Sequence, residues 1–196
     1  LLLENGSPYR VRKGYGFTEN NCAVTMCIND DVNEMGGCGV PMPLTDVTIY
    51  NNGQDLGYDE IGEVCVTGPD LMLEYLNNPG ENAEALKLHE DGQVWFHSGD
   101  LGKIDSRGRF TATGRIKDLI ILYNGQKVYP NDVEKILSEH PDVKYISLVG
   151  VQDKEHYNGE VPVAFVVFKD GVNLEEATFN LDCFALDSLV PYSVPV

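Results

Sequence analysis

The sequence predicts an α+β protein in two parts, because its hydrophobic pattern changes character partway along the chain. The first half alternates apolar and polar residues in short runs between glycine-rich turns, which is typical of antiparallel strands. The second half mixes helical and strand patterns, which indicates a small, compact α+β unit. We place the boundary at residues 115–118 and expect parts that span residues 1–116 and 117–196. The first part should be mostly β, as a small sheet or distorted barrel.

Four runs in the first half carry strand patterns: residues 44–50, 61–68, 93–99 and 109–113. We expect the segments LGKID and SRG to connect the last two runs. Residues 71–88 contain the pair Pro79-Gly80, which predicts a break in the chain. A short helical patch should follow it, with apolar positions from Ala83 to Leu88.

The second half contains two helical patterns among its strands. Pro130 suits the first turn of a helix, and Asn131 and Asp132 suit its N-terminal dipole. A glycine turn, YNGQ, precedes this helix. We predict strands over residues 118–122, 143–151 and 161–168, and a last helix over residues 174–189.

The charge of the chain limits the partners that it can bind. The 196 residues carry a formal net charge of −17, and 42% of them are hydrophobic. Nucleic acids and anionic membranes attract positive charge, so we expect no nucleic-acid partner. We also expect no integral membrane segment, because no apolar run is long enough to span a bilayer.

The cysteines indicate reduced thiols and a cytoplasmic location. The chain has five cysteines, an odd number, and contains no C-x-x-C motif. We assign all five to packing. The spacing of the cysteines and of the four histidines does not favour a zinc site.

The segment GYGFTENN, residues 14–21, raises the first question of function. It places Tyr15 between two glycines and follows it with Thr18 and Glu19. One interpretation is a turn that happens to be polar. The other is a nucleotide site, with a ring for stacking, a hydroxyl for phosphate and a carboxylate for a metal ion. A motif this short does not decide between them.

The motifs further along the chain favour the nucleotide site. In order they are GEVCVTG (62–68), YLNNP (75–79), WFHSGDLG (95–102), TGRIKDLI (113–120) and NGQKVYPNDVE (124–134). With these motifs in this order, the chain resembles the adenylate-forming superfamily of acyl-CoA synthetases, acyl-AMP ligases, luciferases and peptide-synthetase adenylation domains. The resemblance covers nearly the whole chain.

The resemblance implies a two-step reaction. A carboxylic acid attacks the α-phosphate of ATP and gives an acyl-adenylate and pyrophosphate, and a thiol then takes the acyl group. The implied cofactors are ATP, Mg²⁺ and coenzyme A. The resemblance also implies that residues 1–116 end the large ATP- and acyl-binding domain. Residues 117–196 would belong to a small domain that swings between the two steps.

The resemblance assigns roles to residues of the first part. It implies that Tyr15 lies against adenine and that Gly16 belongs to the same binding motif, although backbone geometry alone is a reason for a glycine there. Thr18 and Glu19 are the implied catalytic residues: Thr18 would bind phosphate, and Glu19 would hold Mg²⁺. Asp100 would bind the ribose hydroxyls.

Near the boundary, the resemblance implies three further roles. Arg115 would reach the ribose or a phosphate, and Lys117 would lie at the hinge. Gly125 would lie in a turn that leaves a path for pantetheine, since glycine has no side chain. Lys127 has two equal interpretations, a site residue or a surface charge.

Two parts of the family pattern are absent from these 196 residues. The phosphate loop rich in Ser, Thr and Gly would lie upstream of Tyr15. The catalytic lysine of the family lies near the C-terminus. The final residues of this chain, LVPYSVPV (189–196), resemble the segment shortly before that lysine. We therefore expect an inactive fragment of an active parent enzyme.

The sequence IKDLIILYNGQKVYP, residues 116–130, resembles CoA ligases of the fatty acyl type more than peptide-synthetase domains. The leading hypothesis is ligation of a carboxylic acid, with fatty acids favoured, to coenzyme A. A ligase that loads the pantetheine of a carrier protein is the first alternative, and a noncatalytic interaction module is the second. The acyl substrate itself is not readable, because its pocket would form mainly upstream.

Overall fold

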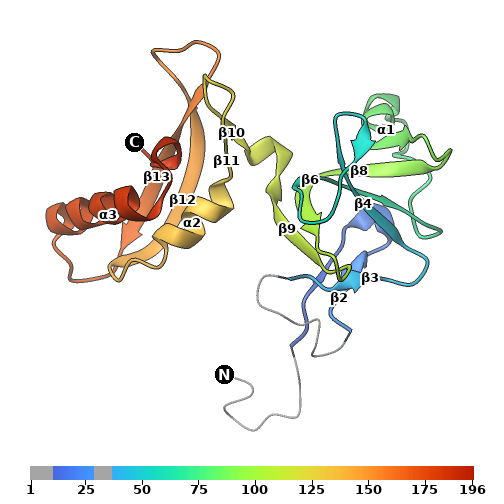
Figure 1. The fold of residues 1–196 in the computed structure, drawn as a ribbon, viewed down its shortest axis with the longest axis horizontal. Helices are drawn as coiled ribbons and strands as arrows, with labels where there is room; N and C mark the ends of the chain where they lie inside the picture. The colour runs from blue at the N-terminus through green and yellow to red at the C-terminus, as the bar shows by residue number, and fades with distance from the viewer. Residues whose placement is uncertain (1–10, 29–36) are drawn as a thin grey trace, which may run out of the picture. The chain divides into compact units, whose positions relative to one another are not determined.

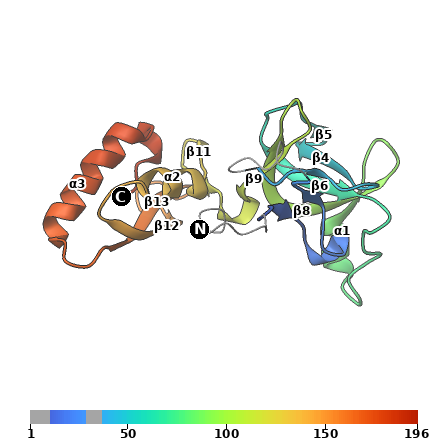
Figure 2. The same ribbon diagram turned by 90° about the horizontal axis from the view of Figure 1, so that it is seen from below.

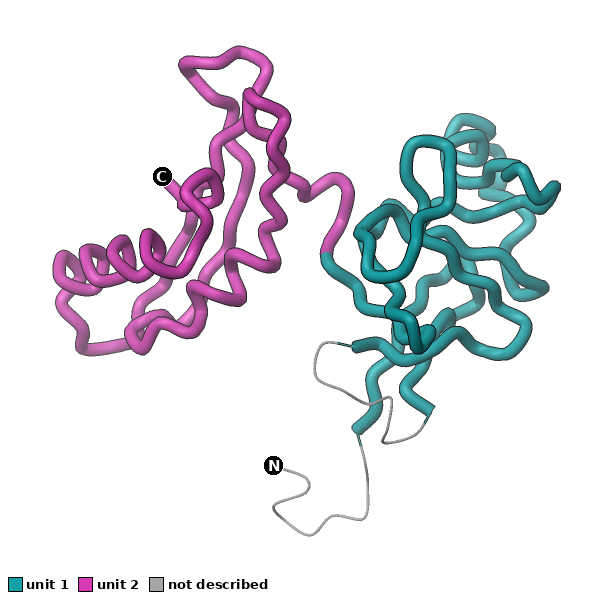
Figure 3. The backbone as a smooth tube through the Cα atoms, viewed as in Figure 1, with its two compact units in different colours: residues 1–113 teal, residues 114–196 magenta. Residues whose placement is uncertain are grey.

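The computed structural model describes residues 11–28 and 37–196, and their α+β architecture confirms the predicted fold class (Figure 1). The chain divides into two compact units, Leu1–Thr113 and Gly114–Val196, called unit 1 and unit 2 below (Figure 3). The sequence placed the boundary after residue 116. The assignment of these units to a large domain and a swinging domain stays a prediction.

Unit 1 is built on a six-stranded sheet. The order is β5-β4-β6-β8-β7, and β9 also pairs with β8. The strands are β4 (Asp46–Asn51), β5 (Gln54–Asp55), β6 (Gly62–Thr67), β7 (Leu86–Leu88), β8 (Val94–Ile104) and β9 (Phe110–Arg115).

A smaller antiparallel sheet joins this unit. It contains β1 (Gly14–Tyr15), β2 (Thr25–Met26) and β3 (Val40–Pro41), and the 3-10 helix η1 (Thr18–Asn20) follows β1. The buried residues of the unit 1 core come from the larger sheet and from the loop before β2: Val24, Ile49, Val64, Val66 and Phe110. Since Tyr15 and Phe17 pack against this core, the core fixes the start of the predicted nucleotide segment.

Unit 2 places two helices on a long antiparallel ribbon (Figures 1 and 2). The ribbon pairs β12 (Val143–Gln152) with β13 (Glu160–Phe168), and the helices are α2 (Pro130–Leu137) and α3 (Leu174–Ser188). Asn173 caps α3 by accepting a hydrogen bond from the Glu176 amide at 3.2 Å. The core of unit 2 joins Val133 and Leu137 of α2, Leu148 of β12, and Leu181 and Ala185 of α3.

A short hairpin precedes α2. It pairs β10 (Ile120–Ile121) with β11 (Lys127–Val128), after the 3-10 helix η3 (Ile116–Asp118). The strand predicted over residues 118–122 is therefore shorter than expected. Its first residue belongs to η3, whose turn ends with the Leu119 amide donating to the Ile116 carbonyl.

Three predictions in unit 1 were wrong. Pro79 and Gly80 do not break the chain but begin helix α1 (Pro79–Ala85), with Asn78 as its N-cap. Residues Leu86–Leu88 are not helical; they form β7, because pairing with β8 supplies their backbone hydrogen bonds. The predicted LGKID connection also belongs to β8, which continues through it to Ile104.

None of the helices in the described part of the chain has both the length and the apolar composition needed to cross a membrane.

Candidate nucleotide site

The fold brings Tyr15 and Asp100 into direct contact. Tyr15 lies in β1 and Asp100 in β8, and the Tyr15 hydroxyl donates a hydrogen bond of 2.7 Å to Asp100 Oδ2. The Tyr15 ring also packs on Phe110, with ring centroids 4.8 Å apart, and meets the edge of Phe17 at 5.7 Å. Two residues that the sequence assigned separately to adenine and ribose therefore form one half-buried unit.

The glycine after Tyr15 has a steric cause. A Cβ atom on Gly16 would lie 1.7 Å from the Cys22 carbonyl oxygen, far inside any real contact. The chain turns back at this point, and the Cys22 amide donates to the Phe17 carbonyl at 3.1 Å. Gly16 therefore allows the tight loop that presents Tyr15 at one end and η1 at the other.

A tyrosine positions the Glu19 carboxylate. The Tyr75 hydroxyl donates to Glu19 Oε1 at 2.6 Å, and the Met72 amide donates to the Glu19 carbonyl at 2.7 Å. Burial raises the pKa of Tyr75 to about 12, with further contributions from its hydrogen bond to Glu19 and from the Glu19 charge. Tyr75 is therefore a neutral donor at physiological pH.

The Asn82 side chain holds Tyr75 in turn. Its Oδ1 accepts from the Tyr75 amide at 2.6 Å, and its Nδ2 donates to the Tyr75 carbonyl at 2.9 Å. The sequence analysis assigned no role to Tyr75, although the YLNNP motif that contains it was noted. Thr18 lies beside Glu19 in η1, and its side chain is exposed.

The segment before Asp100 is built on side-chain bonds to β6. Ser98 Oγ donates to the Val64 carbonyl at 2.7 Å and accepts from the Asp100 amide at 3.1 Å. Gly99 has a φ of +70°, and its amide donates to Glu63 Oε1 at 3.1 Å. The hydroxyl of Ser98 thus fixes the backbone that carries Asp100. The role of Glu63 was not predicted.

The other predicted site residues lie in unit 2. Arg115 is the last residue of β9, Lys117 lies in η3, and Gly125 lies in the turn between β10 and β11. Gly125 has a φ of +79°, which favours glycine, and its amide donates to the Leu122 carbonyl at 2.8 Å. All three residues are exposed. Their contact with a nucleotide or thiol remains a prediction.

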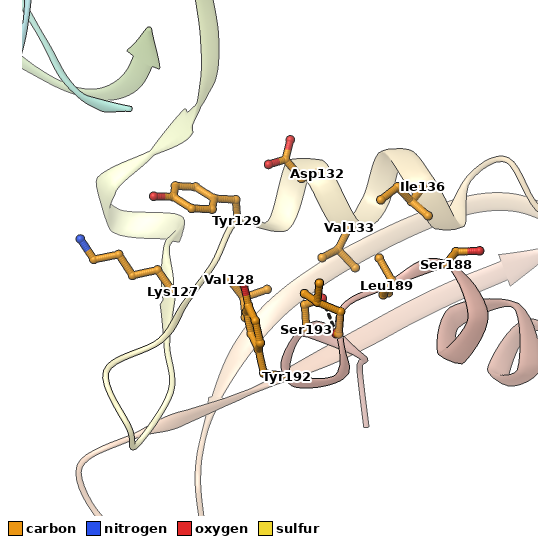
Figure 4. A pocket seen from close by; sticks show the side chains of 11 residues that line it. Lys127, Val128, Tyr129, Asp132, Val133, Ile136, Ser188, Leu189, Tyr192 and Ser193 are labelled. Carbon is orange, nitrogen blue, oxygen red and sulfur yellow. Dashed lines mark hydrogen bonds between the residues drawn. The ribbon is translucent and has the colours of Figure 1, made fainter. Parts of the chain in front are cut away.

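Unit 2 also has a small cavity of about 220 Å³ beside α2 (Figure 4). Val133 and Leu189 contribute apolar side chains to it, while Lys127 and Tyr129 line the end toward β11. Burial raises the pKa of Tyr129, with a further contribution from Asp132. Lys127 therefore lies next to an apolar lining, which is compatible with both a site residue and a surface charge.

The match to family models defines the class of protein. The model described as AMP-binding enzyme matches residues 3–76, and the model described as AMP-binding enzyme C-terminal domain matches residues 132–195. Together they match more than half of the chain. The chain belongs to the family of AMP-binding, adenylate-forming enzymes.

Individual relatives are similar over most of this chain. It is 39% identical over 185 residues to a long-chain-fatty-acid–CoA ligase of Bacillus subtilis (strain 168), covering 93% of this chain and 31% of the ligase. It is 38% identical over 167 residues to a luciferin 4-monooxygenase of Nipponoluciola cruciata, covering 85% of this chain and 29% of that protein.

A solved structure is similar over the full chain. The O-succinylbenzoate coenzyme A synthetase of Bacillus subtilis, in complex with ATP and magnesium ion, matches with a TM-score of 0.79 and 30% identity. The match covers 100% of this chain and 38% of the synthetase. The chain thus spans well under half the length of the relatives that it matches.

Proposed function

We propose that the chain is part of an ATP-dependent acid–thiol ligase that activates a carboxylic acid as its adenylate and passes the acyl group to coenzyme A. The observation that carries the proposal is the hydrogen bond between Tyr15 and Asp100, 85 residues apart, in a family defined by AMP binding. Similarity to a long-chain-fatty-acid–CoA ligase supports a fatty acid as the substrate class. We also propose that the protein is located in the cytoplasm.

In this proposal, Tyr15 and Asp100 bind the nucleoside. An aromatic ring offers a flat apolar face to adenine at a low entropic cost. A carboxylate accepts hydrogen bonds at two oxygens, with about four lone-pair sites. The Tyr15 hydroxyl donates to Asp100 Oδ2 at 2.7 Å, and in this proposal the carboxylate also accepts from the ribose hydroxyls.

The proposed residues for the phosphates and Mg²⁺ are Thr18 and Glu19. Mg²⁺ prefers carboxylate oxygen, and one Tyr75 hydrogen bond leaves acceptor capacity on Glu19, so this residue fits the ion. When bound, Mg²⁺ would offset negative charge on the phosphates. Tyr75 is a positioning residue, because its hydroxyl orients the carboxylate through Oε1.

The proposed roles in unit 2 concern the nucleotide, the hinge and the thiol. Arg115 would reach the ribose or a phosphate, and Lys117 would be the hinge. Gly125 has no atoms within 4 Å of the place where a Cβ would stand, so the turn has open space beside it. That space supports the proposed path for a pantetheine thiol.

The test is ATP–pyrophosphate exchange with a panel of carboxylic acids, using the full-length enzyme and this 196-residue chain. We expect exchange by the enzyme and none by the chain. Asp100→Asn in the enzyme should lower the exchange rate by roughly 10- to 100-fold, since a hydrogen bond to a charged group contributes about 1.5–3 kcal/mol. Asp70→Asn is the matched control, because Asp70 is exposed and has no proposed role in binding.

Two outcomes would redirect the proposal. No exchange with any acid, although ATP binds, would favour an interaction module. Exchange followed by acyl transfer to a carrier protein but not to coenzyme A would favour the carrier-loading ligase.

A further inference from the structure

Three side chains of metal-binding types converge in unit 1, and none of them is a residue assigned to the nucleotide. The donor atoms of Cys65, His89 and His97 all lie within 4.8 Å of one another. The two imidazoles face each other, with His89 Nε2 and His97 Nε2 2.9 Å apart. The spacing of these residues along the sequence gave no reason to expect the cluster, which forms only in the folded chain.

The sheet itself creates this convergence. Cys65 on β6 and His97 on β8 are direct cross-strand partners, so their side chains point to the same face. His89 comes directly after β7, in the turn that leads into β8, where its amide donates to the Gln93 carbonyl at 3.0 Å. The three ligands thus come from adjacent strands and one connecting turn.

The surroundings hold both imidazoles in place. Glu63 Oε2 lies 2.7 Å from His97 Nδ1, which directs Nε2 of the same ring toward His89. A carboxylate on the outer nitrogen is the usual support of a metal-binding histidine. The His89 ring stacks with Tyr50 at 4.3 Å and with Trp95 at 5.4 Å between centroids.

The cluster also has suitable burial and charge. Cys65 is fully buried and His97 is 8% exposed, while His89 is only partly buried and gives access from one side. Burial raises the pKa of the Cys65 thiol, and the Glu63 and Asp55 carboxylates raise it further; their negative charge would favour a cation beside the sulfur. A hydrogen bond between His89 and His97 would explain why the two imidazoles lie close together, but it does not explain the position of the Cys65 sulfur beside them.

We propose that Cys65, His89 and His97 bind a transition-metal ion, with Zn²⁺ as the best match. Thiolate sulfur and imidazole nitrogen are the ligands that Zn²⁺ prefers in tetrahedral sites. With Zn–N bonds of about 2.0–2.1 Å, tetrahedral geometry separates the two nitrogens by about 3.3 Å. The rings therefore need to move apart by only a few tenths of an ångström. Three protein ligands leave a fourth position for water or another small ligand. This site does not depend on the proposed ligase activity.

The test is binding of Zn²⁺ and Co²⁺ to the metal-stripped chain, with exposed Cys22 and Cys183 replaced by serine. Equilibrium dialysis with metal analysis should find one ion per chain. Co²⁺ should give the visible bands of a tetrahedral site and a thiolate charge-transfer band in the near ultraviolet. Bound Zn²⁺ should also raise the thermal midpoint.

Matched variants identify the ligands. Cys65→Ser should remove the charge-transfer band, and His89→Gln should weaken binding by more than about 10-fold. Glu63→Gln should weaken it by about 10- to 100-fold, as loss of a supporting carboxylate does elsewhere. His156→Gln is the control, because this exposed imidazole lies in unit 2 and should leave binding unchanged.

The decisive variant is His89→Gln, since His89 is the least buried of the three ligands and its loss is the least disruptive to the core. Circular dichroism will show whether each variant is folded. Binding of less than about one-tenth of an ion per chain, or a Co²⁺ spectrum that His89→Gln does not change, would overturn the proposal.

Discussion

The two units hold their predicted functional residues in different ways. In unit 1, Tyr15, Glu19 and Asp100 are half-buried, and their side chains bond to residues far away in the sequence. In unit 2, Lys117 and Gly125 lie exposed on short turns. The core of unit 2 is elsewhere, between its helices and the ribbon. The predicted residues Tyr15, Glu19 and Asp100 are therefore held within the fold of unit 1, whereas Lys117 and Gly125 lie on the surface of unit 2.

The largest expected effect tests whether the units are energetically separate. Phe110→Ala in unit 1 should cost about 3–5 kcal/mol, and Leu137→Ala in unit 2 about 2–5 kcal/mol, because both residues are almost fully buried. Hydrogen exchange measured at individual backbone amides should show that each variant loses protection only in the unit that carries the substitution. A comparable loss of protection in both units would show that the two units are not energetically separate.

The second prediction concerns the tight loop before η1. Gly16→Ala should destabilise unit 1 by about 3 kcal/mol, because the added methyl collides with backbone that cannot move away. Urea unfolding measures the change. Gly80→Ala is the control, since a Cβ there meets nothing within 4 Å and helix α1 favours alanine. Equal effects of the two substitutions would show that the loop can relax.

The third prediction uses the tyrosine that positions Glu19. Tyr75→Phe should cost about 1 kcal/mol at neutral pH through loss of its hydrogen bond. The pKa of Tyr75 rises from 10 to about 12 on folding, so its contribution is complete below pH 10 and is lost as the pH rises toward 12. The difference in unfolding free energy between wild type and variant should shrink over that range.

The control for this variant is Tyr58→Phe, which removes a hydroxyl from a tyrosine that is 66% exposed. Its stability difference from wild type should stay near zero and independent of pH. A constant difference for Tyr75→Phe between pH 10 and 12 would contradict the raised pKa of Tyr75.

The smallest expected effect on stability is at the proposed hinge. Lys117→Ala should change the unfolding free energy by less than about 0.5 kcal/mol, as exposed positions usually do. In the full-length enzyme, the same variant should slow one half-reaction, measured by separate assays of adenylate formation and thiol transfer. A stability loss as large as that of Gly16→Ala would mean that unit 2 also builds its functional residues into its fold.

Local patterns predicted much of the fold. The strands over 143–151 and 161–168 were found almost to the residue, because their β-branched residues favour strand locally. Strand β7 was missed because the apolar residues after α1 continue a helical spacing, and only the partner strand β8 makes them extended. The local conformational preference of a segment is overridden where a strand distant in the sequence supplies its backbone hydrogen bonds.

The same distinction holds for the sites. The motifs pointed to Tyr15, Glu19 and Asp100 individually, and the structure adds that Tyr15 and Asp100 touch. Tyr75 could not be assigned, since its contact with Glu19 spans 56 residues. The cluster of Cys65, His89 and His97 depends on strand register and a turn, neither of which leaves a periodic signal in the sequence.

The assignment of cysteines to packing was only partly right. Cys27 and Cys65 are buried, but Cys22 and Cys183 are exposed.

The central claim is that unit 1 carries a nucleotide site around Tyr15 and Asp100. The most direct test is an amide NMR titration of the 196-residue chain with AMP, since NMR detects weak binding. We predict saturable shifts concentrated in residues 14–20 and 98–101, which Asp100→Asn abolishes and Asp70→Asn does not. Shifts that do not saturate, or that lie elsewhere and survive Asp100→Asn, would contradict it.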